Sequence, residues 1–129
     1  GVTAGGVTLA GVRSFVLDAE NTVEPGPPDA SVSPARPARV RCGPRALALG
    51  LRYYATTATL RDLQCSGTPF ALSVTLPTAS GRTISLEFPA VYCRTVRRVP
   101  GRSGVAECEA DLLPVADASG TDVTWTAVP

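Results

Sequence analysis

The chain contains no histidine, lysine or methionine among its 129 residues. Without histidine there is no imidazole general base, no Ser-His-Asp or Cys-His arrangement, and no Cys2His2 zinc site. All twelve basic residues are arginine and eleven residues are acidic, so the formal net charge is +1. We therefore expect no uniformly basic surface for nucleic acid or anionic lipid, although a local patch remains open.

Long apolar runs are also missing. No run reaches eighteen apolar residues, so no membrane partner is expected. The first ten residues, GVTAGGVTLA, lack the basic start and apolar stretch of a secretory signal, so any such signal is expected to have been removed. The length suits a single domain, residues 1–129, with one core.

Along most of the chain, every second residue is apolar, which is the pattern of β-strands. Strands are predicted over 12–23, 45–54, 69–77, 82–89, 90–113 as a hairpin, and 121–128. Seven or so strands with one short helix and frequent turns predict an all-β fold, either an antiparallel β-sandwich or a flattened barrel.

The segment 56–68 changes to helical spacing. Leu60 and Leu63 are three residues apart, Thr56 or Thr57 is expected to cap the start, and Gly67 is expected to end the helix. A helix of two turns is predicted.

The hairpin around the turn 78–82 has a register fixed by its apolar residues. Leu76 is predicted opposite Ile84, Val74 opposite Leu86, and Leu72 opposite Phe88. Every apolar pair then lies on one face of the sheet.

The next hairpin, 90–113, carries two of the four cysteines. A turn at 99–103 that places Val96 opposite Val105 also places Cys93 opposite Cys108. Opposed β-carbons are close enough for a disulfide after slight adjustment, and two free buried thiols are the alternative. No CxxC pair occurs, so a zinc cluster would need four cysteines from distant strands, and no metal is expected.

Cys42 and Cys65 are left to pair with each other or to remain free. Disulfides would indicate an oxidising compartment or a thermophilic source.

Four carboxylates form the main candidate polar cluster: Glu87, Glu107, Glu109 and Asp111. A pair of them would suit glycoside hydrolysis. An exposed strand face is the more ordinary interpretation, with Arg94 opposite Glu107 and Tyr92 opposite Glu109 as cross-strand partners. The third interpretation is that this face lines an interior channel.

Arginines gather in two places, at the second hairpin (Arg94, Arg97, Arg98, Arg102) and at the end of a proline-rich segment (Arg36, Arg39, Arg41). That segment, EPGPPDASVSPARPARV, holds five of the twelve prolines and predicts a stiffened loop or arm over 24–39. Since few aromatic residues lie nearby, self-association is favoured over nucleic-acid binding. Trp125 is interpreted as core or interface packing.

The order of these features resembles tail tube (major tail) proteins of long-tailed bacteriophages. The matching stretches are ENTVE at 20–24, LALGLRYY at 47–54, LRDLQ at 60–64, SGTPFALSVTL at 66–76 and ISLEFPAV at 84–91. The resemblance implies a structural protein of the virion tail, assembled in the host cytoplasm, with no enzymatic activity and no cofactor. Its partners would be further copies of itself, stacked in rings, and other tail proteins, with DNA passing through the lumen without sequence recognition.

Under that resemblance two groups of residues gain roles. The lumen-facing candidates are Glu87, Glu107, Glu109 and Asp111, because carboxylates would repel DNA phosphates. The candidates for contacts between subunits are Pro25, Pro27, Pro28, Arg36, Arg39, Arg98 and Arg102. The competing hypotheses are a secreted, disulfide-bonded β-sandwich binding module, and an enzyme, which the absence of histidine disfavours.

Overall fold

The computed structural model describes residues 1–25, 28–29, 36–37, 40–55, 58–78, 81–101 and 104–128, with side chains defined for 1–21, 45–55, 58–78, 81–101 and 104–127. The chain divides into two compact units, Gly1–Leu17 with Ala48–Pro129, and Asp18–Leu47. The elements in chain order are β1 (Val2–Ala4), β2 (Val7–Thr8), β3 (Val12–Pro25), β4 (Pro28–Asp29), β5 (Arg36–Pro37), β6 (Val40–Tyr54), α1 (Thr59–Ser66), β7 (Phe70–Pro77), β8 (Thr83–Val99), β9 (Glu107–Val115) and β10 (Thr124–Val128).

The prediction of an all-β, antiparallel fold with one short helix is confirmed. Eight strands form one sheet in the order β2-β1-β7-β8-β9-β6-β3, and β10 pairs with β8 off this path. This order starts at β2 and ends at β3, so the sheet stays open and the flattened barrel is not formed.

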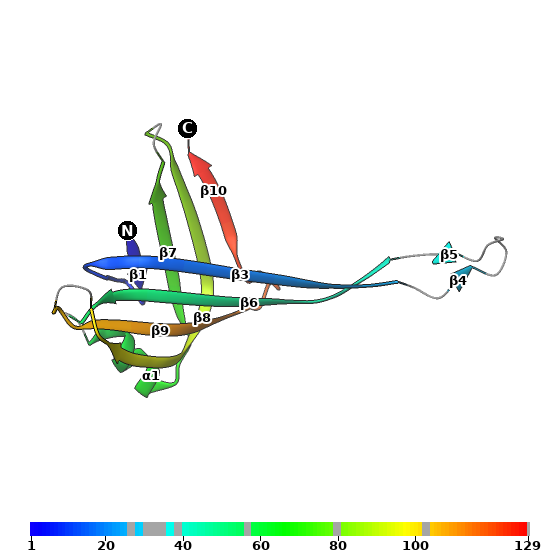
Figure 1. Ribbon diagram of the computed structural model, residues 1–129. Helices are drawn as coiled ribbons and strands as arrows, with labels where there is room; N and C mark the ends of the chain where they lie inside the picture. The colour runs from blue at the N-terminus through cyan, green and yellow to red at the C-terminus, as the bar shows by residue number, and fades with distance from the viewer. Residues whose placement is uncertain are drawn as a thin grey trace. The chain divides into compact units, whose positions relative to one another are not determined.

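β8 joins the two halves of this sheet. Residues 83–91 pair with β7 on one edge, and residues 83–87 pair with β10 on the other. Residues 90–99 then pair with β9, which pairs in turn with β6. In Figure 1, β7, the first part of β8 and β10 run side by side and cross the direction of β9. The two halves therefore pack as crossed layers, with β8 turning from one into the other.

The core lies between these layers. β6 contributes Leu49, Leu51 and Tyr53 on alternate positions, as the sequence predicts. The opposite layer and the helix contribute buried side chains that include Val2, Leu60, Phe70, Leu72, Val74, Phe88 and Val91. Burial of one face of each strand explains why the period-two pattern is so regular.

The first hairpin has the predicted register. Leu76 pairs with Ile84, Val74 with Leu86 and Leu72 with Phe88. The Thr78 N–H donates to the Arg82 carbonyl at 2.8 Å and closes the turn.

The helix α1 is also confirmed, but its cap differs from the expected one. The N-cap residue is Ala58, which makes no side-chain capping hydrogen bond. Gly67 ends the helix in the left-handed conformation, with φ of 65°, as predicted. Thr56 and Thr57 lie outside the described residues.

The register predicted for the second hairpin is wrong. Val96 pairs with Ala110, and Cys93 pairs with Leu112 rather than with Cys108. β8 and β9 are joined by the longer connection 100–106, and the register shifts between Cys93 and Thr95. A β-bulge of this kind adds one residue to one strand, which simple alternation does not reveal.

In the second compact unit, the described part of the proline-rich segment includes short strands. β3 extends to Pro25, and β4 pairs with β5 in an antiparallel ladder of two residue pairs. Pro27 and Arg39 lie outside the described residues, as does Arg102 in the connection after β8.

Candidate functional site

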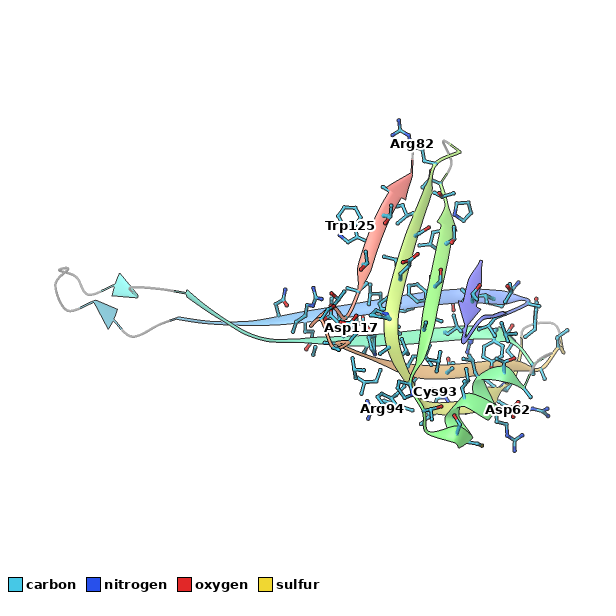
Figure 2. The ribbon with its side chains drawn as sticks, turned by 180° about the vertical axis from the view of Figure 1, so that it is seen from behind. Asp62, Arg82, Cys93, Arg94, Asp117 and Trp125 are labelled. Carbon is cyan, nitrogen blue, oxygen red and sulfur yellow. The ribbon has the colours of Figure 1, made fainter. Side chains whose placement is uncertain are left out.

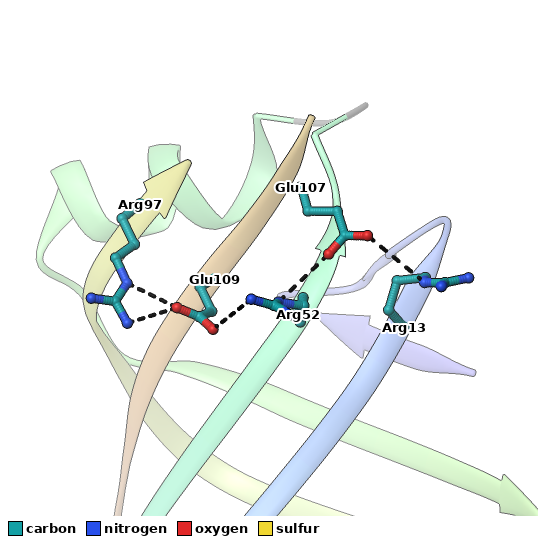
Figure 3. A network of polar contacts seen from close by, with 5 residues as sticks. All are labelled: Arg13, Arg52, Arg97, Glu107 and Glu109. Atoms are coloured by element: carbon teal, nitrogen blue, oxygen red, sulfur yellow. Dashed lines mark hydrogen bonds and ion pairs between the residues drawn. The ribbon is translucent and has the colours of Figure 1, made fainter. Parts of the chain in front are cut away.

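Five charged side chains form a continuous network across four strands (Figure 3). Glu107 on β9 lies between Arg13 on β3 and Arg52 on β6, at 3.9 and 3.5 Å. Arg52 also contacts Glu109 at 3.2 Å, and Glu109 accepts a 2.7 Å contact from Arg97 on β8. The network spans β3, β6, β9 and β8 in the order in which these strands pair.

Part of this network is buried away from water. Glu107 is buried, with 5% of its surface exposed, and the Arg52 Nε is buried without a well-formed hydrogen bond. The contact from that nitrogen to Glu107 is therefore ionic. The Arg13 guanidinium also lies 5.5 Å from the centre of the Tyr54 ring, a cation–π distance.

The cross-strand partners of the carboxylates differ from the predicted ones. Glu109 pairs with Arg97 rather than with Tyr92, and the β8 residue opposite Glu107 is Val99 rather than Arg94. Glu109 does face an arginine across the strands, but Glu107 is buried, so the interpretation of an exposed strand face is wrong for Glu107. The partners changed because the hairpin register changed.

Asp111 and Glu87 stand apart from the network. Asp111 accepts a 2.7 Å hydrogen bond from the Thr95 hydroxyl and has no arginine partner among the ion pairs of the described residues. Glu87 lies on the first part of β8, opposite Ser73 and Thr124, in the other half of the sheet. Three of the four predicted carboxylates thus lie on β9, two of them in the network, and Glu87 lies in the other half of the sheet.

A second cluster surrounds the buried Tyr53 side chain. Burial, and then the nearby Cys108 thiol, raise the pKa of Tyr53 to about 12. Burial, and then the charge of Asp111, raise the pKa of Cys93 to about 11. Both groups therefore stay protonated near neutral pH and behave as packing groups rather than as nucleophiles.

The disulfide predicted between Cys93 and Cys108 is absent. Both thiols are free, as is the exposed thiol of Cys65. The side chain of Cys42 lies outside the described residues. Within the described part of the chain, no group of three histidine, cysteine, aspartate or glutamate residues is placed to hold a metal ion. No described helix has the length and apolar character that a membrane span requires.

Two of the open pockets in the first unit are larger than 500 Å³. One, of about 520 Å³, is lined by residues of β1, β7 and β8 and by the turn 117–121, and its charged residues are Glu87 and Asp117. The other, of about 550 Å³, is lined by α1 and by the ends of β6, β8 and β9, and its charged residues are Arg61 and Arg98. Neither pocket was predicted from the sequence, because each joins segments that are distant along the chain.

Trp125 is not a core residue, so the interpretation of this tryptophan as core packing is wrong. The residue is 70% exposed. Figure 2 shows its side chain projecting from β10. It pairs with Leu86, and the next pairs along the sheet join Ala127 to Ile84 and Ile84 to Leu76. Ile84 and Leu76 are also exposed. The far end of this layer therefore presents an uncovered apolar surface, the Trp125 patch (Leu76, Ile84, Trp125, Ala127).

Solved structures provide the comparison that bears on this fold. A chain in the tail of an empty gene transfer agent particle, determined with C6 symmetry, aligns with a TM-score of 0.62 and 12% identity over 92% of this chain and 84% of that chain. The present chain shares its fold. A chain in the virion of a native gene transfer agent particle aligns with a TM-score of 0.58 and 15% identity, over 92% of this chain and 87% of that one.

The other comparisons add no family. No protein-family model matches this sequence, and no curated protein matches it. The likeness to the tail chain therefore concerns architecture, and the role of this chain must be argued from its own surfaces.

Proposed function

We propose that this chain is a structural subunit of a phage-like tail tube, which self-assembles into stacked rings around a channel for DNA. The observation that carries the proposal is the shared fold with a chain of a gene transfer agent tail, which extends over 92% of this chain. The absence of histidine and the protonated state of the buried Tyr53 and the half-buried Cys93 agree with a structural rather than a catalytic role.

The open sheet supports self-association. Among the described strands, β3 ends the sheet and β10 pairs only with β8, so each has one edge without a partner. Such edges invite pairing with another chain unless they are covered. The Trp125 patch adjoins the edge strand β10, and exposed apolar surface of this kind marks interaction sites.

The β9 face is our choice for the channel lining, with Glu109 and Asp111 facing the lumen. Glu107 is buried between two arginines and is not included in this lining. The ion pairs of Glu107 and Glu109 balance their charges, so Asp111 would supply the repulsion toward DNA phosphates. Glu87 lies in the other half of the sheet and is not included in this lining.

The proline-rich segment 24–39 is our choice for the contact between rings, with Pro25, Pro28 and Arg36 among its contact residues. Prolines lower the conformational entropy that such a segment loses when it docks.

Electron microscopy and light scattering of the purified chain test the central proposal. We expect rings, short tubes or polymers whose size grows with protein concentration. A chain that stays monomeric at every concentration would overturn the assembly role.

The channel assignment has its own test. In particles that carry Asp111→Arg, we expect tails of normal length in micrographs and reduced DNA transfer. Loss of the tails would instead place Asp111 in a contact between subunits.

A further inference from the structure

The pocket beside α1, called here the arginine pocket, holds two cations and no anion. Arg61 on α1 and Arg98 on β8 line it, and none of its lining residues that the structure describes is an aspartate or glutamate. Neither arginine forms an ion pair with any residue that the structure describes. Polar groups of Gln64 and Tyr53 share the lining, but the Gln64 amide already donates to the Arg94 carbonyl at 3.1 Å. Two guanidinium groups are thus available to an external anion.

The other pocket, called here the carboxylate pocket, has the opposite composition. Glu87 and Asp117 line it, and no arginine is found among the described residues of its lining. Asp117 Oδ1 accepts hydrogen bonds from the Ser119 hydroxyl at 2.6 Å and from the Ser119 and Thr121 amides at 2.8 and 3.0 Å. These bonds, the Ser119 hydroxyl foremost, lower the pKa of Asp117 and keep it ionised. They leave its second carboxylate oxygen for another partner.

The two pockets have no residue in common, and their sizes are similar, about 550 and 520 Å³. Each has two charges of one sign, and their signs are opposite. Arginine and carboxylate form bidentate, charge-assisted hydrogen bonds, which are among the stronger polar contacts. A second copy of this chain therefore carries charges opposite in sign to those of each pocket.

We propose that the arginine pocket of one copy binds the carboxylate pocket of a second copy, with Arg98 and Glu87 in contact. This inference rests on the proposed self-assembly and specifies one contact within it. Such a contact is head to tail, since a different surface is used on each copy. Repetition of a head-to-tail contact gives a closed ring or a helical polymer, depending on the rotation between copies.

Charge reversal tests this contact. In Arg98→Glu the reversed position meets Glu87, and in Glu87→Arg the reversed position meets Arg98, so each variant places like charges at the proposed contact. We expect each variant alone to need about tenfold or more protein to assemble, a loss of about 1.4 kcal/mol or more per contact. In a polymer in which the two variants alternate, every contact again joins opposite charges. We therefore expect an equimolar mixture to assemble at a concentration close to that of the unmodified chain.

Three further variants serve as controls. Arg98→Lys keeps the charge and should retain assembly. Arg94→Glu makes the same charge change at an exposed position of the same strand that lines neither pocket, and we expect unchanged assembly. Arg61→Glu replaces Arg98→Glu if circular dichroism shows that the latter does not fold.

The outcomes separate the two proposals. If the unmodified chain assembles and the reversed variants assemble equally well, this contact is wrong and the tail-tube role stands. The contact is also wrong if the mixture fails to recover, or if Arg94→Glu has the same effect. A monomeric unmodified chain would remove both proposals.

Discussion

Arg52 and Glu107 meet across β6 and β9, with the Arg52 Nε 3.5 Å from Glu107 Oε2 and the Glu107 side chain only 7% exposed. Glu107→Gln keeps the side-chain volume and removes the negative charge between Arg13 and Arg52. Because the Arg52 side chain is 41% exposed, water compensates part of the loss. We expect the free energy of unfolding to fall by about 1–3 kcal/mol, measured by urea denaturation.

Glu20→Gln is the matched control for this change. Glu20 is exposed on β3, so its replacement should alter the free energy of unfolding by less than about 0.5 kcal/mol. Equal losses in the two variants would show that the ion pairs of Glu107 do not stabilise the fold.

Gly11 supports a close approach of the backbone to Tyr54. Its φ is +67°, and a β-carbon there would clash with the Tyr54 ring. Its carbonyl also accepts a hydrogen bond from the Tyr54 amide at 3.1 Å. Gly11→Ala should therefore cost about 2–4 kcal/mol, the sum of left-handed strain and overpacking, in thermal or urea unfolding.

Gly81→Ala separates the two costs. Gly81 has a φ of +77° but open space around it, so only the strain of about 1–2 kcal/mol should appear. If both variants lose the same stability, the contact with Tyr54 contributes nothing.

The two hairpins show what the sequence predicts well and what it does not. Val74 opposite Leu86 follows from a tight turn at 78–82 and from apolar pairs that match on one face only. In the second hairpin, Val96 opposite Val105 also matches, but the actual register includes a bulge near Cys93 and a seven-residue connection. Packing of β9 against β6, which is distant in sequence, fixes that register and has no local signal.

The same reason limits prediction of the site. Glu107 and Glu109 were identified on one strand face by their spacing, but their arginine partners come from β3, β6 and β8. Which strands lie next to β9 determines those pairs, and alternation along one strand does not encode it. Trp125 was ambiguous for a related reason, since exposure depends on whether another layer covers β10.

Trp125 is predicted to matter for assembly and little for folding. The side chain is 70% exposed and lies opposite Leu86 on an edge strand. Trp125→Ala should change the free energy of unfolding of the dilute chain by less than about 0.5 kcal/mol. It should raise the concentration needed for assembly by about tenfold or more, because buried tryptophans dominate interface energies.

Thr126→Ala is the control, since Thr126 lies on the opposite face of β10, paired with Ser85. Light scattering against concentration distinguishes the variants. Normal assembly of Trp125→Ala would show that the Trp125 patch is not a contact surface.

Cys93 should make the fold sensitive to alkaline pH. Burial, and then Asp111, raise the pKa of its thiol from 9.0 to about 11. Above pH 9 the unfolded chain loses this proton while the folded chain keeps it, so unfolding is favoured progressively until pH 11. Because Cys93 is partly exposed and water screens part of this effect, the unmodified chain should lose about 1–2 kcal/mol more stability than Cys93→Ala between pH 8 and pH 11, measured by urea unfolding at each pH.

Cys65→Ala, which removes an exposed thiol, is the matched control. Tyr53, whose pKa is raised from 10.0 to about 12, adds a loss at higher pH in all three proteins. Stability profiles that stay parallel for the unmodified chain and Cys93→Ala would show that the Cys93 thiol is not buried in the folded protein.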